Sequence, residues 1–169
     1  MKKIILELNS LEITDSVARE IASNLFPGAI ILLWGNMGTG KTTFAKSLCA
    51  GLGILPETVI SPTYTMVNIY SGKWEILHVD LFRLTTSEQL DDFDSADLFA
   101  EKGITLVEWP EFISEFLADE PVLNLHFKTI SENKRQLIMK SESTNFDTLL
   151  NTLKQPIFSR EKSKKPLIR

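Results

Sequence analysis

A glycine-rich segment between a short apolar run and an amphipathic stretch constrains this chain more than any other feature. Residues 35–42 read GNMGTGKT, which fits the pattern G-x-x-x-x-G-K-[ST]. An apolar run at residues 29–34 precedes it, and residues 41–52 follow with apolar side chains at helical spacing. A buried strand, a phosphate-binding loop and a helix in this order predict a site for a nucleoside triphosphate.

The residue types in this loop indicate how a phosphate would be held. Glycine reaches backbone angles closed to other residues, so the loop can wrap a phosphate with converging N–H groups. The next helix adds unpaired donors and the positive end of its dipole. Lys41 would lie beside the β- and γ-phosphates, and the Thr42 hydroxyl would ligate Mg²⁺. The residues expected to bind the nucleotide are Asn36, Met37, Gly38, Thr39, Gly40, Lys41, Thr42 and Thr43.

Two acids end segments that we expect to be buried strands. Asp80 ends the segment EILHVD, and Glu108 ends the segment ITLVE. Mg²⁺ prefers oxygen ligands, and an acid at the end of a strand beside the loop commonly supplies one. Glu108 follows the more continuous apolar run, so we expect it to hold the metal, directly or through water. Asp80 is expected to orient or activate the attacking water, or to share the metal.

Several other residues admit two interpretations. Residues 61–65, SPTYT, either sense a γ-phosphate as switch segments do or form a turn that enters a strand. His78 has apolar neighbours on both sides, which favours a structural histidine, and His126 is expected on a strand surface. Trp109 follows Glu108 directly and packs either near the nucleotide or a docking face, or in the core.

The order of the expected elements indicates an α/β fold. Strands are expected at residues 2–8, 29–34, 66–70, 74–80, 104–107, 122–128 and 134–140, with helices at 11–25, 41–52 and 111–117 and short helices after Thr86 and Ser95. Strands alternate with helices early, and strands pair in the middle and at the end. This predicts a P-loop NTPase-like three-layer sandwich with a mixed, largely parallel central sheet, antiparallel edge hairpins and flanking helices.

Charge is unevenly distributed along the 169 residues. The net charge is −4, but residues 160–169 alone carry +4, which leaves −8 on residues 1–159. Such an acidic body is a poor general binder of nucleic acid, since phosphate contacts need clustered Lys and Arg. We expect one domain with the phosphate-binding loop at 1–150 and a flexible basic tail at 151–169. Cys49 is the single cysteine and no apolar run is long enough to span a membrane, so a cytoplasmic protein is expected.

The use of the nucleotide is less constrained than its binding. A GTPase should carry N/T-K-x-D, and residues 133–136, NKRQ, lack the acid. A kinase that phosphorylates a small molecule or nucleoside stays open, because residues 80–83, DLFR, pair an acid with an arginine as nucleoside kinases do. A module that binds nucleotide without useful catalysis also stays open.

Four motifs together carry a resemblance to a known family. These are residues 35–43, SPTYT at 61–65, HVDLFR at 78–83 and LVEWP at 106–110, in this order and spacing. They resemble the bacterial TsaE (YjeE) family, the ATPase of tRNA threonylcarbamoyladenosine synthesis, over roughly residues 10–140. Phe82 stands where that family often has Tyr, and the basic tail is not part of the pattern.

The resemblance implies a cytoplasmic protein that binds ATP and Mg²⁺ and works with TsaD and TsaB, without a membrane or DNA. The protein would contact tRNA at most indirectly, through that complex. The resemblance places Lys41 and Thr42 at the phosphates and the metal, and Glu108 at the metal. It assigns Asp80 to hydrolysis and places Trp109 beside the nucleotide or the partner. Residues 10–14 would border the adenine. No arginine is evidently placed to assist, so slow hydrolysis of ATP is expected without partners.

Overall fold

The computed structural model describes residues 1–154, without the side chains of Ser95, Ala96 and Glu115. Within this range the strands form one sheet in the order β1-β7-β6-β2-β5-β4-β3. Their bounds are β1 Lys2–Leu8, β2 Ile30–Trp34, β3 Val67–Ser71, β4 Glu75–Asp80, β5 Ile104–Glu108, β6 Val122–Ser131 and β7 Lys134–Ser141. The helices are α1 Leu11–Ser23, α2 Lys41–Gly51, α3 Ser95–Leu98 and α4 Asp147–Leu153, with 3₁₀ turns η1 Pro56–Thr58, η2 Ser87–Asp92, η3 Ser114–Leu117 and η4 Thr144–Phe146.

The sheet is parallel at its centre and antiparallel at both edges. The sheet is parallel between β6 and β2, between β2 and β5, and between β5 and β4. It is antiparallel between β1 and β7 and between β7 and β6 at one edge, and between β4 and β3 at the other. The two hairpins expected around residues 71–74 and 131–134 are both present. This confirms the predicted mixed α/β fold.

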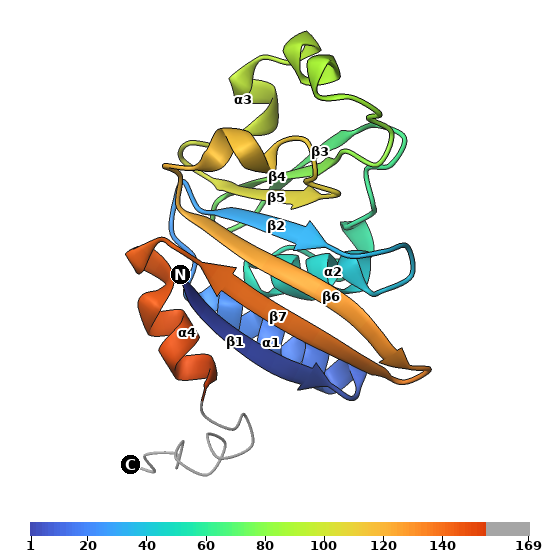
Figure 1. The fold of residues 1–169 in the computed structure, drawn as a ribbon, viewed down its shortest axis with the longest axis vertical. Helices are drawn as coiled ribbons and strands as arrows, with labels where there is room; N and C mark the ends of the chain where they lie inside the picture. The colour runs from blue at the N-terminus through green and yellow to red at the C-terminus, as the bar shows by residue number, and fades with distance from the viewer. Residues whose placement is uncertain (155–169) are drawn as a thin grey trace.

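Apolar side chains cover both faces of the sheet. On one face α1 and α2 lie side by side and pack with alternate residues of β2, β5 and β6 (Figure 1). On the other face a smaller cluster joins β2, β4 and β5 to η2, α3 and η3. The central strands are therefore buried on both sides, which explains their nearly continuous apolar sequences.

Most expected helix boundaries agree with the structure. Ser10 caps α1 by accepting a hydrogen bond from the Ile13 N–H, and Thr86 with Gln89 forms the predicted capping box. The helix expected over residues 111–117 is wrong in extent. The segment makes one four-residue hydrogen bond, from the Ser114 N–H to the Pro110 carbonyl, and otherwise forms the 3₁₀ turn η3. Helix α4 runs to Leu153, and residues 155–169 of the predicted tail lie outside the described residues.

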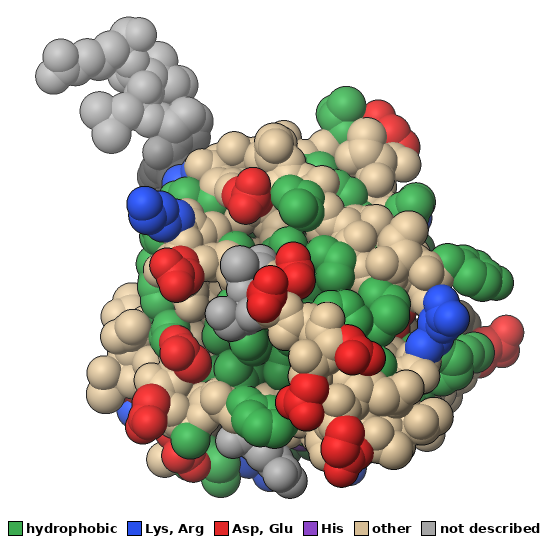
Figure 2. Space-filling view, turned by 90° about the horizontal axis from the view of Figure 1, so that it is seen from above, with side chains coloured by type: hydrophobic (Ala, Val, Ile, Leu, Met, Phe, Trp, Pro, Cys, Tyr) green, Lys and Arg blue, Asp and Glu red, His purple; other side chains and the backbone are tan. Residues whose placement is uncertain are grey.

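The end of the molecule that carries α3 is acidic. Figure 2 looks onto this end and shows scattered Asp and Glu side chains with few Lys or Arg. The aspartates of the segment 91–97 are exposed there, and no group of acids that could hold a metal alone occurs in the described part of the chain. Among residues 1–154 no helix has the length and apolar character needed to cross a membrane.

Candidate functional site

The glycine-rich loop connects the end of β2 to the start of α2, as predicted. Gly40 precedes the first helical residue with a φ of 102°, a left-handed angle that disfavours side chains. No side chain caps the helix start. The N-terminal amides of α2 therefore point into the site without a competing side-chain acceptor, as an anion-binding helix start requires.

Lys41 is buried at the base of this loop. Its Nζ donates to the carbonyl oxygens of Gly35, at 2.5 Å, and Asn36, at 3.1 Å. The same ammonium lies 4.0 Å from the centre of the Trp109 ring. Burial lowers the pKa of Lys41, and nearby carboxylates, led by that of Glu108, oppose the shift. The loop thus holds a positive charge at the place where a polyphosphate would need one.

Glu108 lies directly opposite the first turn of α2. It ends β5 and is only 2% exposed. The Thr42 hydroxyl lies 3.3 Å from each of its carboxylate oxygens, and Nε2 of His78 lies 3.1 Å from Oε1. The two groups predicted to ligate the metal, Thr42 Oγ1 and the Glu108 carboxylate, are therefore neighbours.

Asp80 ends β4 in register with Glu108 on the adjacent strand. Its Oδ2 accepts hydrogen bonds from Ser61, at 3.1 Å, and Thr63, at 2.7 Å. Its Oδ1 accepts from the Phe82 N–H at 2.9 Å. The segment 61–65 therefore enters the site through its hydroxyls, and Asp80 fixes it there.

Trp109 closes one side of the site. Its backbone has a φ of 57°, which is uncommon for a bulky residue and strained. The ring packs against Phe82, with 4.9 Å between ring centres, and covers the Lys41 ammonium. Of the two interpretations left open, packing beside the loop is the one that the structure supports.

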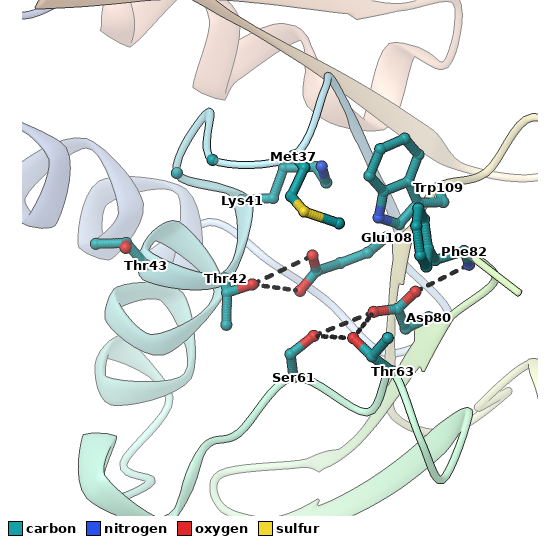
Figure 3. A pocket seen from close by; sticks show the side chains of 12 residues that line it. Met37, Lys41, Thr42, Thr43, Ser61, Thr63, Asp80, Phe82, Glu108 and Trp109 are labelled. Carbon is teal, nitrogen blue, oxygen red and sulfur yellow. Dashed lines mark hydrogen bonds between the residues drawn. The ribbon is translucent and has the colours of Figure 1, made fainter. Parts of the chain in front are cut away.

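These groups surround one cleft, with a volume of about 260 Å³. Figure 3 shows the Thr42 hydroxyl facing the Glu108 carboxylate, Ser61 and Thr63 facing Asp80, and the rings of Trp109 and Phe82 beside each other. The cleft is lined by Met37, Gly38, Gly40, Lys41, Thr42, Thr43, Ser61, Thr63, Asp80, Phe82, Glu108 and Trp109. Strand ends and a helix start from distant parts of the chain thus converge on a single space.

Two residues expected at the nucleotide lie outside this cleft. Asn36 and Thr39 line a groove on the outer side of the loop, where the Thr39 hydroxyl donates to the Asn36 carbonyl at 2.8 Å. Thr39 also lines a second pocket beside the cleft, together with residues 8–11 and Thr14. That pocket shares Gly38, Gly40 and Thr43 with the cleft.

The donor set fits Mg²⁺. A hydroxyl and a carboxylate lie together with a second carboxylate on the next strand, and all are oxygen ligands. Among the described residues no group of three or more His, Cys, Asp or Glu could hold a metal by itself. Mg²⁺ in nucleotide-binding proteins commonly has one or two protein carboxylates as ligands, together with phosphate oxygens and water.

Sequence reasoning missed part of the site. His78 was expected to be structural, yet it contacts Glu108, and Phe82 lines the cleft although only its motif was noted. The signal for His78 was its spacing, because residues two apart on a strand share a face and Asp80 was already a candidate. His126 stacks on Trp34 with 5.3 Å between ring centres, away from the cleft, on the strand as expected.

A phosphate-loop geometry at the carboxyl edge of a parallel sheet, followed by lysine and threonine at a helix start, defines a P-loop NTPase-like protein. A family model described as threonylcarbamoyl adenosine biosynthesis protein TsaE matches residues 8–137. The chain belongs to the TsaE family, whose role is in tRNA threonylcarbamoyladenosine biosynthesis. The resemblance drawn from four sequence motifs is thereby confirmed.

Individual relatives agree with this assignment. The tRNA threonylcarbamoyladenosine biosynthesis protein TsaE of Aquifex aeolicus is 39% identical over 140 residues, 81% of this chain and 94% of that protein. The protein of the same description from Bacillus subtilis is 32% identical over 143 residues, 84% and 88% of the two chains. The crystal structure of Bacillus subtilis YdiB has a TM-score of 0.71 at 28% identity and covers 96% of this chain and 97% of its own.

Proposed function

We propose that this protein binds ATP with Mg²⁺ in the cleft and hydrolyses it to ADP and phosphate. We further propose that this hydrolysis serves the TsaD–TsaB complex in the threonylcarbamoyladenosine modification of tRNA in the cytoplasm. The observation that carries the proposal is the convergence on one cleft of Lys41, the Thr42–Glu108 pair and Asp80. A bare glycine-rich turn would not require buried acids from two other strands opposite it.

The residues divide the work between holding the triphosphate and directing water. The amides at the start of α2 and the Lys41 ammonium offset the negative charge that shifts among the phosphate oxygens as the bond breaks. Thr42 and Glu108 are the residues that would hold Mg²⁺, which would help to neutralise the negative charge of the phosphate oxygens. Lys41 exchanges its carbonyl partners for phosphate oxygens.

Asp80 is the group that we assign to the attacking water. Its carboxylate is 1% exposed and is held from two sides, by the hydroxyls of Ser61 and Thr63 and by the Phe82 amide. A carboxylate fixed in this way can accept a hydrogen bond from water and orient it. Because Ser61 and Thr63 line the same cleft, a change in that segment would move Asp80 and alter the rate.

The second pocket suits the adenosine. It adjoins the cleft around Gly38 and Thr43 and has a volume of about 530 Å³. Leu8 and Leu11 offer apolar surface, and Asn9, Ser10 and Asn133 offer hydrogen-bonding groups. One pocket therefore combines apolar surface for the base with side chains that can hydrogen-bond to the base and the ribose. We therefore propose that the adenine lies near residues 10–14.

Calorimetry with Mg–ATP and Mg–ADP tests binding, and release of labelled phosphate tests hydrolysis. We expect Lys41→Ala to abolish binding and Asp80→Asn and Glu108→Ala to abolish turnover. Lys46→Ala is the matched control, because it removes the same charge from the exposed side of α2. No heat with any Mg–nucleotide would refute the proposal.

The partner is tested separately. A pulldown with TsaB and TsaD, in ATP and in ADP, is expected to recover the complex and to depend on the nucleotide. The phosphate-release rate is expected to rise when both partners are added. Label transferred to a metabolite instead of free phosphate would indicate a kinase, and tight binding without release would indicate a binding module.

A further inference from the structure

His78 lies against Glu108 in the interior of the protein. It sits on β4, two residues before Asp80, and its side chain is fully buried. Nε2 lies 3.1 Å from Oε1 of Glu108, and the ring of Tyr70 from β3 flanks it with 6.2 Å between ring centres. Its contact with a carboxylate of the cleft sets this histidine apart from one that only fills the core.

The hydrogen-bond partners of the ring determine which nitrogen carries the proton. A carboxylate that ligates a metal is ionised and only accepts hydrogen bonds, so in the metal-binding form Nε2 of His78 donates to Glu108. Nδ1 is buried and has no hydrogen-bond partner among the described residues. An N–H at that position would be a buried donor without an acceptor, which is costly. The geometry therefore assigns the proton to Nε2, with Nδ1 unprotonated.

The contact fixes the orientation of the carboxylate. Glu108 is held from β4 by His78 and from α2 by Thr42, whose hydroxyl lies 3.3 Å from both oxygens. Without the imidazole, the hydrogen bonds to this carboxylate among the described side chains would be the longer ones from Thr42. Carboxylates that ligate metals are themselves held by hydrogen bonds, and loss of such a partner typically lowers metal affinity 10- to 100-fold.

We propose that His78 is a positioning residue that holds Glu108 in the orientation needed to ligate Mg²⁺ beside Thr42. This inference rests on the proposed function. His78 keeps the Glu108 carboxylate oriented for Mg²⁺ before the nucleotide binds. His78 does not touch the substrate, so its effect passes through Glu108.

Two substitutions separate positioning from packing. His78→Gln keeps an N–H donor at about the reach of Nε2, whereas His78→Leu fills the space without a donor. Thr105→Val is the control, because Thr105 is a buried polar residue of β5 whose hydroxyl accepts from the Ala100 N–H and does not contact Glu108. The melting temperature of each full-length variant reports any loss of stability.

The measurement is the affinity for a fluorescent ATP analogue in EDTA and in a titration of MgCl₂. We expect His78→Leu to weaken Mg²⁺ binding at least about tenfold while the affinity without Mg²⁺ stays unchanged. His78→Gln should recover much of the loss, and Thr105→Val should respond to Mg²⁺ like the wild type. If the wild type and His78→Leu respond equally to Mg²⁺, the positioning role of His78 is refuted, whereas the proposed function stands. Absence of any Mg²⁺ response in the wild type overturns the proposed function and this role with it.

Leucine in place of a buried histidine can unfold the chain, so a second measurement uses the wild type. Long-range ¹H–¹⁵N correlations of the imidazole are expected to show a proton on Nε2 and none on Nδ1. A ring protonated only on Nδ1 would contradict the geometry and remove the basis for positioning.

Discussion

Replacing Gly35 with alanine should damage the protein in a way that the geometry allows to be sized. Gly35 follows β2 with a φ of 137°, and an added Cβ would lie 2.7 Å from the backbone oxygen of Phe127. The angle alone costs an L-residue about 1–3 kcal/mol. The clash involves the backbone of β6 and cannot be relieved by a rotamer change, so overpacking adds about 1–3 kcal/mol.

The matched control is Gly38→Ala in the same loop. Gly38 has a φ of 77° with nothing within 4 Å of an added Cβ, so it carries only the conformational cost of about 1–2 kcal/mol. Urea denaturation should therefore give a loss of about 2–6 kcal/mol for Gly35→Ala and clearly less for Gly38→Ala. With about 2–4 °C per kcal/mol for a domain of this size, Gly35→Ala should melt at least about 4 °C lower than wild type. Equal or reversed losses would refute the reasoning.

Three further predictions concern single groups. Burial raises the pKa of Cys49 to about 12. A thiol-reactive disulfide reagent at pH 8 should therefore label Cys49 only after unfolding, and rapid labelling of the native protein would contradict this. The free energy of unfolding should decrease as the pH rises above about 8.5, because the thiol then ionises in the unfolded chain alone. Burial, followed by the repulsion of Lys140 and other lysines, lowers the pKa of His126. The free energy of unfolding should therefore decrease as the pH is lowered below about 6.5. Lys140→Ala should raise the pKa of His126 in an NMR titration. An unchanged pKa would exclude the effect of the lysine charge. Ser10→Ala removes the cap of α1 and should cost about 1 kcal/mol in urea denaturation, while Ser10→Thr should retain most of the stability.

The strand, loop and helix around Lys41 could be predicted because their signals are local. An apolar run, closely spaced glycines and a helical period need no knowledge of the rest of the chain. Asp80 and Glu108 could be predicted as strand-end acids for the same reason. The fold class followed from the order of these elements, and the structure confirms it.

The contacts between these parts could not be predicted in the same way. His78 reaches Glu108 because β4 and β5 are neighbours in a particular register, with Asp80 opposite Glu108. Ser61 reaches Asp80 across a loop whose path depends on η1 and β3. Such pairings depend on which strands are neighbours in the sheet, and the order of strands in a sheet cannot be read from a single sequence. The residues missed at the site were therefore those whose role depends on a neighbour far along the chain.

The outermost strand has a consequence for how the protein is made. β1 forms its ladder with β7 alone, with Lys2 opposite Ser141 and Leu8 opposite Arg135. Because β1 is synthesised long before β7, its backbone N–H and C=O groups stay open to water or to other chains until β7 has been made. Closing a loop of that span is slow, so folding should proceed late in synthesis rather than piece by piece. A chain ended before β7 would leave both β1 and one edge of β6 without a partner.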